Sequence, residues 1–204
     1  MARLGLILIL LLCGCVGTGN GASGPSCTEV INHLEPATRL TADPIALASS
    51  NQIAKLPAAG SGPRSIVSLQ SLRTPEDYFT SDTHVADPQA RIRVMLRDGF
   101  RAGVDVEYAS DNLLYSLIVL RFRDQAAALD YLHAQLLDVC GISKNAASLK
   151  GTAGISYIRT DGFGRAAFVA GDTEISLCGC RGRSFSEGQQ ISADWVQAIA
   201  EQLR

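Results

Sequence analysis

The chain has 204 residues, and its 18 lysines and arginines and 20 aspartates and glutamates leave a formal net charge of −2. No cluster of basic residues stands out, so the charge pattern argues against nucleic acid as a partner. The residues behind the N-terminal apolar segment are numerous enough for one well-buried domain.

The first predicted element is an export signal at the N-terminus. Arg3 provides a short positive region, residues 4–12 form an apolar run, and Gly14 is a small residue directly before Cys15. This is the layout of a cleaved signal peptide. An ordinary signal peptide and a single transmembrane anchor are the alternatives, although a spanning helix needs ~20 apolar residues and this run is shorter.

The sequence Leu12-Cys13-Gly14-Cys15 resembles the lipobox of bacterial lipoproteins. Cys13 departs from that pattern, because the family usually carries Ala, Ser, Thr or Val at this place. The resemblance implies a signal peptide over residues 1–14, cleavage before Cys15, and attachment of fatty acyl groups such as palmitate to Cys15. It also implies a lipid-anchored location at the extracytoplasmic face of the cell membrane.

Residues 15–25 are predicted to hold the lipidated cysteine and a flexible tether. The segment 16–25 contains four glycines and few residues that could be buried. Such a segment behaves as a coil with an end-to-end distance of about 17 Å. Acyl chains contribute ~0.8 kcal/mol per buried methylene, so two or three of them would anchor the chain stably.

Residues 26–204 are predicted to form a single domain. Ser26 and Glu29 have the spacing of a helix capping box. The alternation over 104–108 indicates a strand with one solvated face, and the apolar run over 113–122 is typical of a covered central strand. In chain order, the predicted elements are a helix over 27–34, a strand candidate over 66–72, a short helix over 74–78, a helix over 87–99, strands over 104–108 and 113–122, a helix over 123–139, strands over 155–160, 163–170 and 173–178, and a last helix capped by Ser192.

Hairpins dominate this order of elements. The predicted fold class is therefore α+β, with an antiparallel sheet of about five strands, helices packed on it, and stabilisation by disulfides. No element is predicted between residues 36 and 64, because Pro44, Pro57 and Pro63 interrupt that segment.

Four cysteines remain for the domain once Cys13 and Cys15 are set aside. They are Cys27, Cys140, Cys178 and Cys180. An even number in an exported chain predicts two disulfides, with three pairings open. On a regular strand, Cys178 and Cys180 point to one face together with Glu174 and Ser176, so each is expected to bond to Cys27 or Cys140 rather than to the other. A bulge at Gly179 would reverse this parity for Cys180.

A thiolate metal site is the alternative for these cysteines. Cys178 and Cys180, with Cys140 and His133, could supply its ligands. Export into an oxidising space favours disulfides instead, so no metal is predicted.

No catalytic motif stands out in the sequence. The three histidines, His33, His84 and His133, are scattered and show no ligand spacing. The chain has no G-x-S-x-G elbow, no phosphate-binding loop and no dinucleotide fingerprint. We therefore expect no catalytic residues, no cofactor and no enzymatic activity.

The layout of residues 87–204 resembles that of small α+β domains in actinobacterial cell-envelope lipoproteins and sensor ectodomains. The leading hypothesis is a non-enzymatic, lipid-anchored envelope protein that binds a small molecule, a lipid or a protein partner. One alternative is an envelope hydrolase with unidentified catalytic residues. The other is a structural or assembly lipoprotein without a binding pocket.

Overall fold

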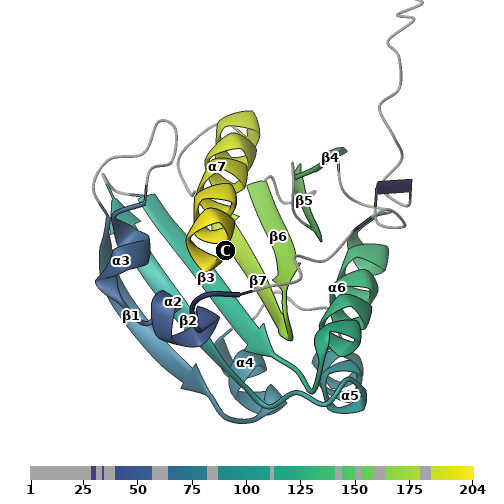
Figure 1. The fold of residues 1–204 in the computed structure, drawn as a ribbon. Helices are drawn as coiled ribbons and strands as arrows, with labels where there is room; N and C mark the ends of the chain where they lie inside the picture. The colour runs from purple at the N-terminus through teal and green to yellow at the C-terminus, as the bar shows by residue number, and fades with distance from the viewer. Residues whose placement is uncertain are drawn as a thin grey trace, which may run out of the picture.

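A computed structural model provides the structure of the chain. It describes residues 29–30, 34, 40–56, 64–81, 87–110, 113–140, 144–149, 153–158, 164–179 and 185–204. An antiparallel sheet with the strand order β1-β2-β3-β7-β6-β5-β4 forms the centre of this described part (Figure 1). The strands are β1 (Ser65–Leu72), β2 (Ala102–Ser110), β3 (Leu113–Arg121), β4 (Lys144–Ser148), β5 (Ala153–Ile158), β6 (Gly164–Ala170) and β7 (Thr173–Gly179).

Helices cover both faces of this sheet (Figure 1). They are α2 (Pro44–Ala48), α3 (Asn51–Ala54), α4 (Pro75–Ser81), α5 (Pro88–Arg97), α6 (Gln125–Cys140) and α7 (Phe185–Leu203). Helices α2, α3 and α7 contribute to the core on one face, and α4, α5 and α6 contribute to the core on the other. Successive side chains of β3 point to opposite faces of the sheet, so this strand contributes to both cores. Leu117 and Val119 point to the α7 side, and Ile118 and Leu120 point to the α6 side.

The sequence correctly predicts an α+β domain with an antiparallel sheet, but the strand count of about five is wrong. The described sheet has seven strands. One of the two additional strands is β1, which the sequence marked only as a candidate. The other is β4, whose sequence KNAAS lacks alternating hydrophobic residues and pairs with β5 through a shifted register. Such a short edge strand leaves no periodic signal.

The predicted start of the last helix is also wrong. Helix α7 begins at Phe185, and Ser192 lies inside it rather than at its N-cap. The Ser192 side chain is fully buried, and its hydroxyl donates a hydrogen bond of 3.3 Å to the Gly164 carbonyl. The serine thus connects α7 to β6 instead of starting the helix.

Helix α5 illustrates the start and stop signals that the sequence displays clearly. Asp87 accepts a hydrogen bond of 2.9 Å from the Ala90 N–H, and Pro88 occupies the first helical turn. Gly99 follows the helix with a φ of 70°, a left-handed conformation that glycine adopts without steric cost. The predicted helix over 87–99 is confirmed.

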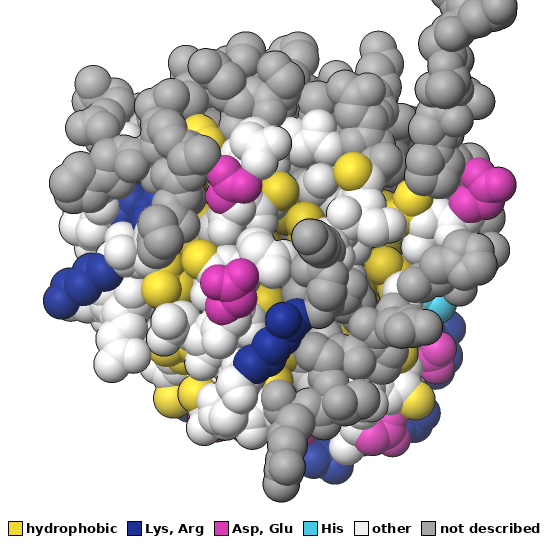
Figure 2. Space-filling view, turned by 45° about the horizontal axis from the view of Figure 1, so that its top comes forward, with side chains coloured by type: hydrophobic (Ala, Val, Ile, Leu, Met, Phe, Trp, Pro, Cys, Tyr) yellow, Lys and Arg dark blue, Asp and Glu magenta, His cyan; other side chains and the backbone are white. Residues whose placement is uncertain are grey.

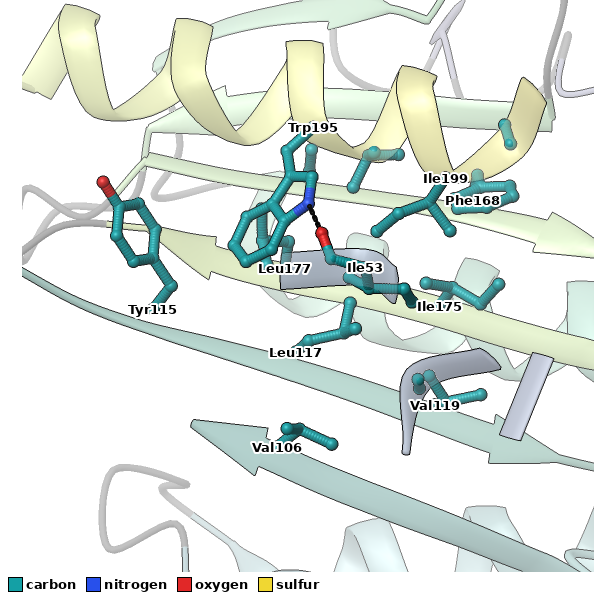
Figure 3. Close-up of a cluster of buried hydrophobic side chains, with 14 of the residues drawn as sticks. Ile53, Val106, Tyr115, Leu117, Val119, Phe168, Ile175, Leu177, Trp195 and Ile199 are labelled. Atoms are coloured by element: carbon teal, nitrogen blue, oxygen red, sulfur yellow. Dashed lines mark hydrogen bonds between the residues drawn. The ribbon is translucent and has the colours of Figure 1, made fainter. Parts of the chain in front are cut away.

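Trp195 on α7 is the centre of the core on the α7 side (Figure 3). Its side chain is fully buried, and its indole N–H donates a hydrogen bond of 3.0 Å to the Ile53 carbonyl in α3. The rings of Tyr108 and Tyr115 contact it edge-on, with centroid distances of 5.0 and 5.5 Å. The Arg64 guanidinium lies 4.2 Å from the centroid of the indole ring.

Helices α2 and α3 are held on the sheet by side chains from distant parts of the chain. Besides the Trp195 bond, the Tyr108 hydroxyl donates to the Ala48 carbonyl at 3.1 Å. Arg64 donates from Nε to the Ala54 carbonyl at 3.2 Å and also contacts the Leu56 carbonyl. Two very short helices are therefore fixed by tertiary hydrogen bonds rather than by their own length.

None of the helices in the described part of the chain has the length and apolarity that crossing a membrane requires.

Candidate functional site

On the α6 side of the sheet, one end of the strands is covered and the other is open. Along β3, Leu120 is fully buried, Ile118 is 6% exposed, Ser116 is half-buried, and Leu114 is 45% exposed. The helices on this side therefore cover the C-terminal end of β3 and leave its N-terminal end accessible.

A line of mostly polar residues crosses the sheet at this open end. Strand register places one residue from each of six neighbouring strands side by side on the α6 side. We call this line the polar row, and its members are Ser68, Glu107, Ser116, Cys178, Arg165 and Tyr157. Glu107 and Ser68 are exposed, whereas Ser116, Cys178 and Arg165 are half-buried. Because Tyr157 is buried, the row can present a carboxylate, the two serine hydroxyls and a guanidinium to a ligand.

A second set of polar residues lies next to the polar row, one step toward the covered end. Asp105 accepts a hydrogen bond of 3.1 Å from the Ser116 hydroxyl. Gln70 donates to the Asp77 carbonyl at 3.4 Å and so contacts helix α4. Ser176 lies opposite Ile118 in the register of β3 and β7. The polar surface therefore continues beneath the edge of the helical layer.

Glu174 lies at the covered end of this same face. Alternation along β7 places it on the same side as Ser176 and Cys178, and it is paired with Leu120 of β3 and Val169 of β6. Its side chain is 0% exposed, and neither carboxylate oxygen has a hydrogen-bond partner of ordinary geometry among the described residues.

Burial dominates the protonation behaviour of this carboxyl group. It raises the pKa of Glu174 to about 8, against the opposing effects of the nearby Ser176 hydroxyl and the positive charges of Arg165 and Arg91. Arg165 belongs to the polar row, and its positive charge favours the ionised form of Glu174. The polar row therefore interacts electrostatically with this carboxyl group. Near neutral pH, the Glu174 carboxyl group is therefore mostly protonated.

The structure places only some of the cysteines named from the sequence. Cys178 lies in the polar row, and Cys140 is the last residue of α6, the helix that packs on β6 and β7. Cys15, Cys27 and Cys180 lie outside the described residues. Val30, three residues after Cys27, is buried in the core on the α6 side.

The histidines do not gather into a site within the described part of the chain. His133 lies on α6, with its Nε2 atom buried and without a hydrogen-bond partner among the described residues. His33 and His84 lie outside the described residues. No group of three or more candidate metal ligands occurs among the side chains that the structure describes.

Figure 2 shows no patch of one charge on the face turned toward the viewer. The described acidic and basic side chains are mixed there with polar and hydrophobic ones. The described side chains on this face therefore form no extended basic surface of the kind that binds a nucleic acid backbone.

Glu174 is the site residue that sequence reasoning missed. Its position beside Ser176 and Cys178 on one strand face follows from the sequence alone, but the sequence analysis gave this carboxyl group no role. Strand β7 instead lies in the middle of the sheet between β3 and β6, and α6 packs over it. The strand order, which no local pattern encodes, decides the burial of this carboxyl group.

No protein-family model matches the chain, and no curated protein sequence matches it. Among solved structures, the chain is similar to the crystal structure of the extracellular domain of PknH from Mycobacterium tuberculosis. The two share 12% sequence identity with a TM-score of 0.47, and the match covers 82% of this chain and 99% of the other.

Proposed function

We propose that this chain is a lipid-anchored, extracytoplasmic binding module of the cell envelope, without catalytic activity, that binds its ligand at the open end of the sheet. The observation that carries the proposal is the polar row beside a fully buried carboxyl group. A flat row of hydroxyl, carboxylate and guanidinium groups can orient a polar ligand through several hydrogen bonds. Glu174 adds a buried carboxyl group whose protonation would change when a charged ligand binds at the polar row.

Within this proposal, Cys15 carries the lipid, residues 16–25 form the tether, and residues 26–204 form the binding domain. Cys27, Cys140, Cys178 and Cys180 form two disulfides. The position of Cys178 on the α6 side and of Cys140 at the end of α6 supports pairing between these parts of the chain. The pairing itself stays open among the three alternatives.

Intact mass spectrometry of the mature protein, taken from membranes without reduction, tests the anchor and the disulfides together. The expected mass is that of a chain beginning at Cys15, increased by its acyl groups and decreased by the four hydrogens that two disulfides remove. Reduction should restore those four hydrogens. A mature chain that begins elsewhere, or four free thiols, would contradict the respective half of the proposal.

A matched pair of cysteine variants separates lipidation from other causes of membrane attachment. Cys15→Ser should move the protein out of the lipid-anchored fraction, because the acyl acceptor is lost, while Cys13→Ser should leave it there.

The binding surface is tested by thermal unfolding with a dialysable extract of the source organism's envelope as the probe. Ligand that binds the native state raises the unfolding midpoint. We expect this increase for the unsubstituted protein and for Arg101→Ala, which removes an exposed arginine at the opposite end of the sheet, but not for Arg165→Ala. An equal increase in all three proteins would contradict a binding surface at the polar row. Hydrolysis of an envelope ester that Ser116→Ala abolishes would contradict a non-catalytic module.

A further inference from the structure

The side chains of β7 on the α6 side form a polar column that runs from the open end of the sheet into its core. Cys178 and Ser176 are half-buried, and Glu174 is fully buried. These three residues extend over about 13 Å along one strand. The core cluster on this side consists of hydrophobic side chains, and a polar group in such surroundings costs stability unless it gains a partner. The column therefore marks the path along which a ligand can extend from the polar row toward Glu174.

Two arginines from different elements act on the Glu174 carboxyl group through their charges. Arg165 belongs to β6 and to the polar row, and Arg91 belongs to α5. Both side chains are half-buried, and each has a buried nitrogen, Nε in Arg165 and Nη1 in Arg91. The hydroxyl of Ser176 acts on the same carboxyl group. Hydrogen-bond donors from three elements therefore lie around Glu174.

The strands on either side of Glu174 add no charge next to it. Leu120 of β3 and Val169 of β6 are its cross-strand neighbours, and both are buried hydrophobic residues. The titratable groups that share this face or lie on the helix above it are Cys178 of β7, Asp105 of β2, and Tyr131 and His133 of α6. Asp105 lies two strands away and accepts a hydrogen bond from Ser116. While Glu174 is protonated, the charges of the two arginines therefore dominate this end of the column.

We propose that the ligand of the polar row carries an oxyanion group, which binds to Arg165, Arg91 and the Ser176 hydroxyl. In the bound state, Glu174 keeps its neutral acid form. This inference rests on the binding function proposed above and names the chemical class of the ligand. Guanidinium groups bind carboxylate, phosphate and sulfate oxygens through strong, charge-assisted hydrogen bonds. A neutral acid can donate one more hydrogen bond, whereas an ionised Glu174 would repel the oxyanion and compete with it for the arginines.

The neutral form of Glu174 makes oxyanion binding depend on pH. Burial raises the pKa of this carboxyl group to about 8. Below that pH the group is already protonated, so binding needs no change of charge. Above it the free protein carries a carboxylate, which must take up a proton before the oxyanion binds. The affinity should therefore fall about tenfold for each pH unit above the pKa.

Thermal unfolding of the full chain in sodium acetate or sodium sulfate tests the ligand class. Both anions stay ionised between pH 6.5 and pH 9, and sodium chloride of equal ionic strength is the reference. At pH 6.5, at least one of them should raise the unfolding midpoint of the unsubstituted protein and of Arg101→Ala more than that of Arg165→Ala. A general salt effect would be equal in all three proteins. Acetate represents a carboxylate ligand, and sulfate represents a tetrahedral ligand such as a phosphate group.

Glu174→Gln tests the role of the neutral acid without removing a donor. Glutamine is uncharged and donates hydrogen bonds at every pH. The anion-dependent increase should therefore persist at pH 9 in Glu174→Gln, while it becomes much smaller in the unsubstituted protein.

Three results would overturn the oxyanion proposal. Neither anion raises the midpoint of the unsubstituted protein at pH 6.5, Arg165→Ala responds as strongly as the unsubstituted protein, or the response of the unsubstituted protein is the same at pH 6.5 and pH 9. If the envelope extract raises the midpoint through Arg165 while both anions fail, the ligand class is wrong and the proposed binding function stands. If the extract fails as well, both are wrong.

Discussion

Replacement of Trp195 by alanine is expected to lower the free energy of unfolding by about 3–5 kcal/mol. The indole is fully buried, contacts the rings of Tyr108 and Tyr115, and donates a hydrogen bond to the Ile53 carbonyl. Its removal leaves a cavity under α7 and an unpaired carbonyl in α3. Chemical denaturation monitored by far-ultraviolet circular dichroism measures this loss.

Two further variants identify the cause of the loss. Trp195→Phe keeps most of the ring volume but removes the N–H donor, so it should cost less than the alanine variant and still loosen α3. Leu137→Ala shortens a side chain that is 59% exposed on α6, and it should change the unfolding free energy by no more than about 0.5 kcal/mol. Equal losses in Trp195→Ala and Leu137→Ala would contradict the central position of the indole.

Replacement of Glu174 by glutamine is expected to stabilise the protein at high pH and to leave it unchanged at low pH. Burial raises the pKa of Glu174 to about 8 in the folded state, above the ordinary value of 4.5. Below pH 4.5 the carboxyl group is protonated in both the folded and the unfolded state and carries no penalty. Between these two pH values the unfolded state releases its proton first, so the free energy of unfolding falls as pH rises.

The size of this effect is bounded by the difference between the two pKa values. At about 1.4 kcal/mol per pH unit, Glu174→Gln gains as much as about 5 kcal/mol over the unsubstituted protein above pH 8. Denaturation curves at pH 4, 6 and 8.5 measure the difference between the two proteins and so cancel the other titrating groups. A constant difference between Glu174→Gln and the unsubstituted protein at all three pH values would contradict the burial of an ionisable carboxyl group.

The fold class was predictable because hairpin turns and alternating strands are local features of the sequence. The α5 boundaries were predictable for the same reason, since Asp87, Pro88 and Gly99 act on the adjacent backbone. Asp43 and Pro44 give α2 the same kind of start, with Asp43 accepting hydrogen bonds of 2.8 and 3.2 Å from Ile45 and Ala46. This helix was missed because it has only five residues and depends on Tyr108 for its attachment.

The candidate site was predictable only in part. The alternation of side chains along β7 correctly places Glu174, Ser176 and Cys178 on one face, because strand geometry alone determines which residues share a face. The neighbours of these residues depend on strand order, which places β7 between β3 and β6 and brings Arg165 next to Cys178. Long-range pairing of this kind leaves no trace in sequence spacing. The same holds for the burial of Glu174, which requires the helical layer above it.

The thermal midpoint with and without the envelope extract, compared between the unsubstituted protein and Arg165→Ala, tests most directly whether the open end of the sheet binds a ligand. A binding module that uses the polar row should show an increase that disappears with the Arg165 guanidinium. An increase of the same size in both proteins, or none in the unsubstituted protein, would contradict that function.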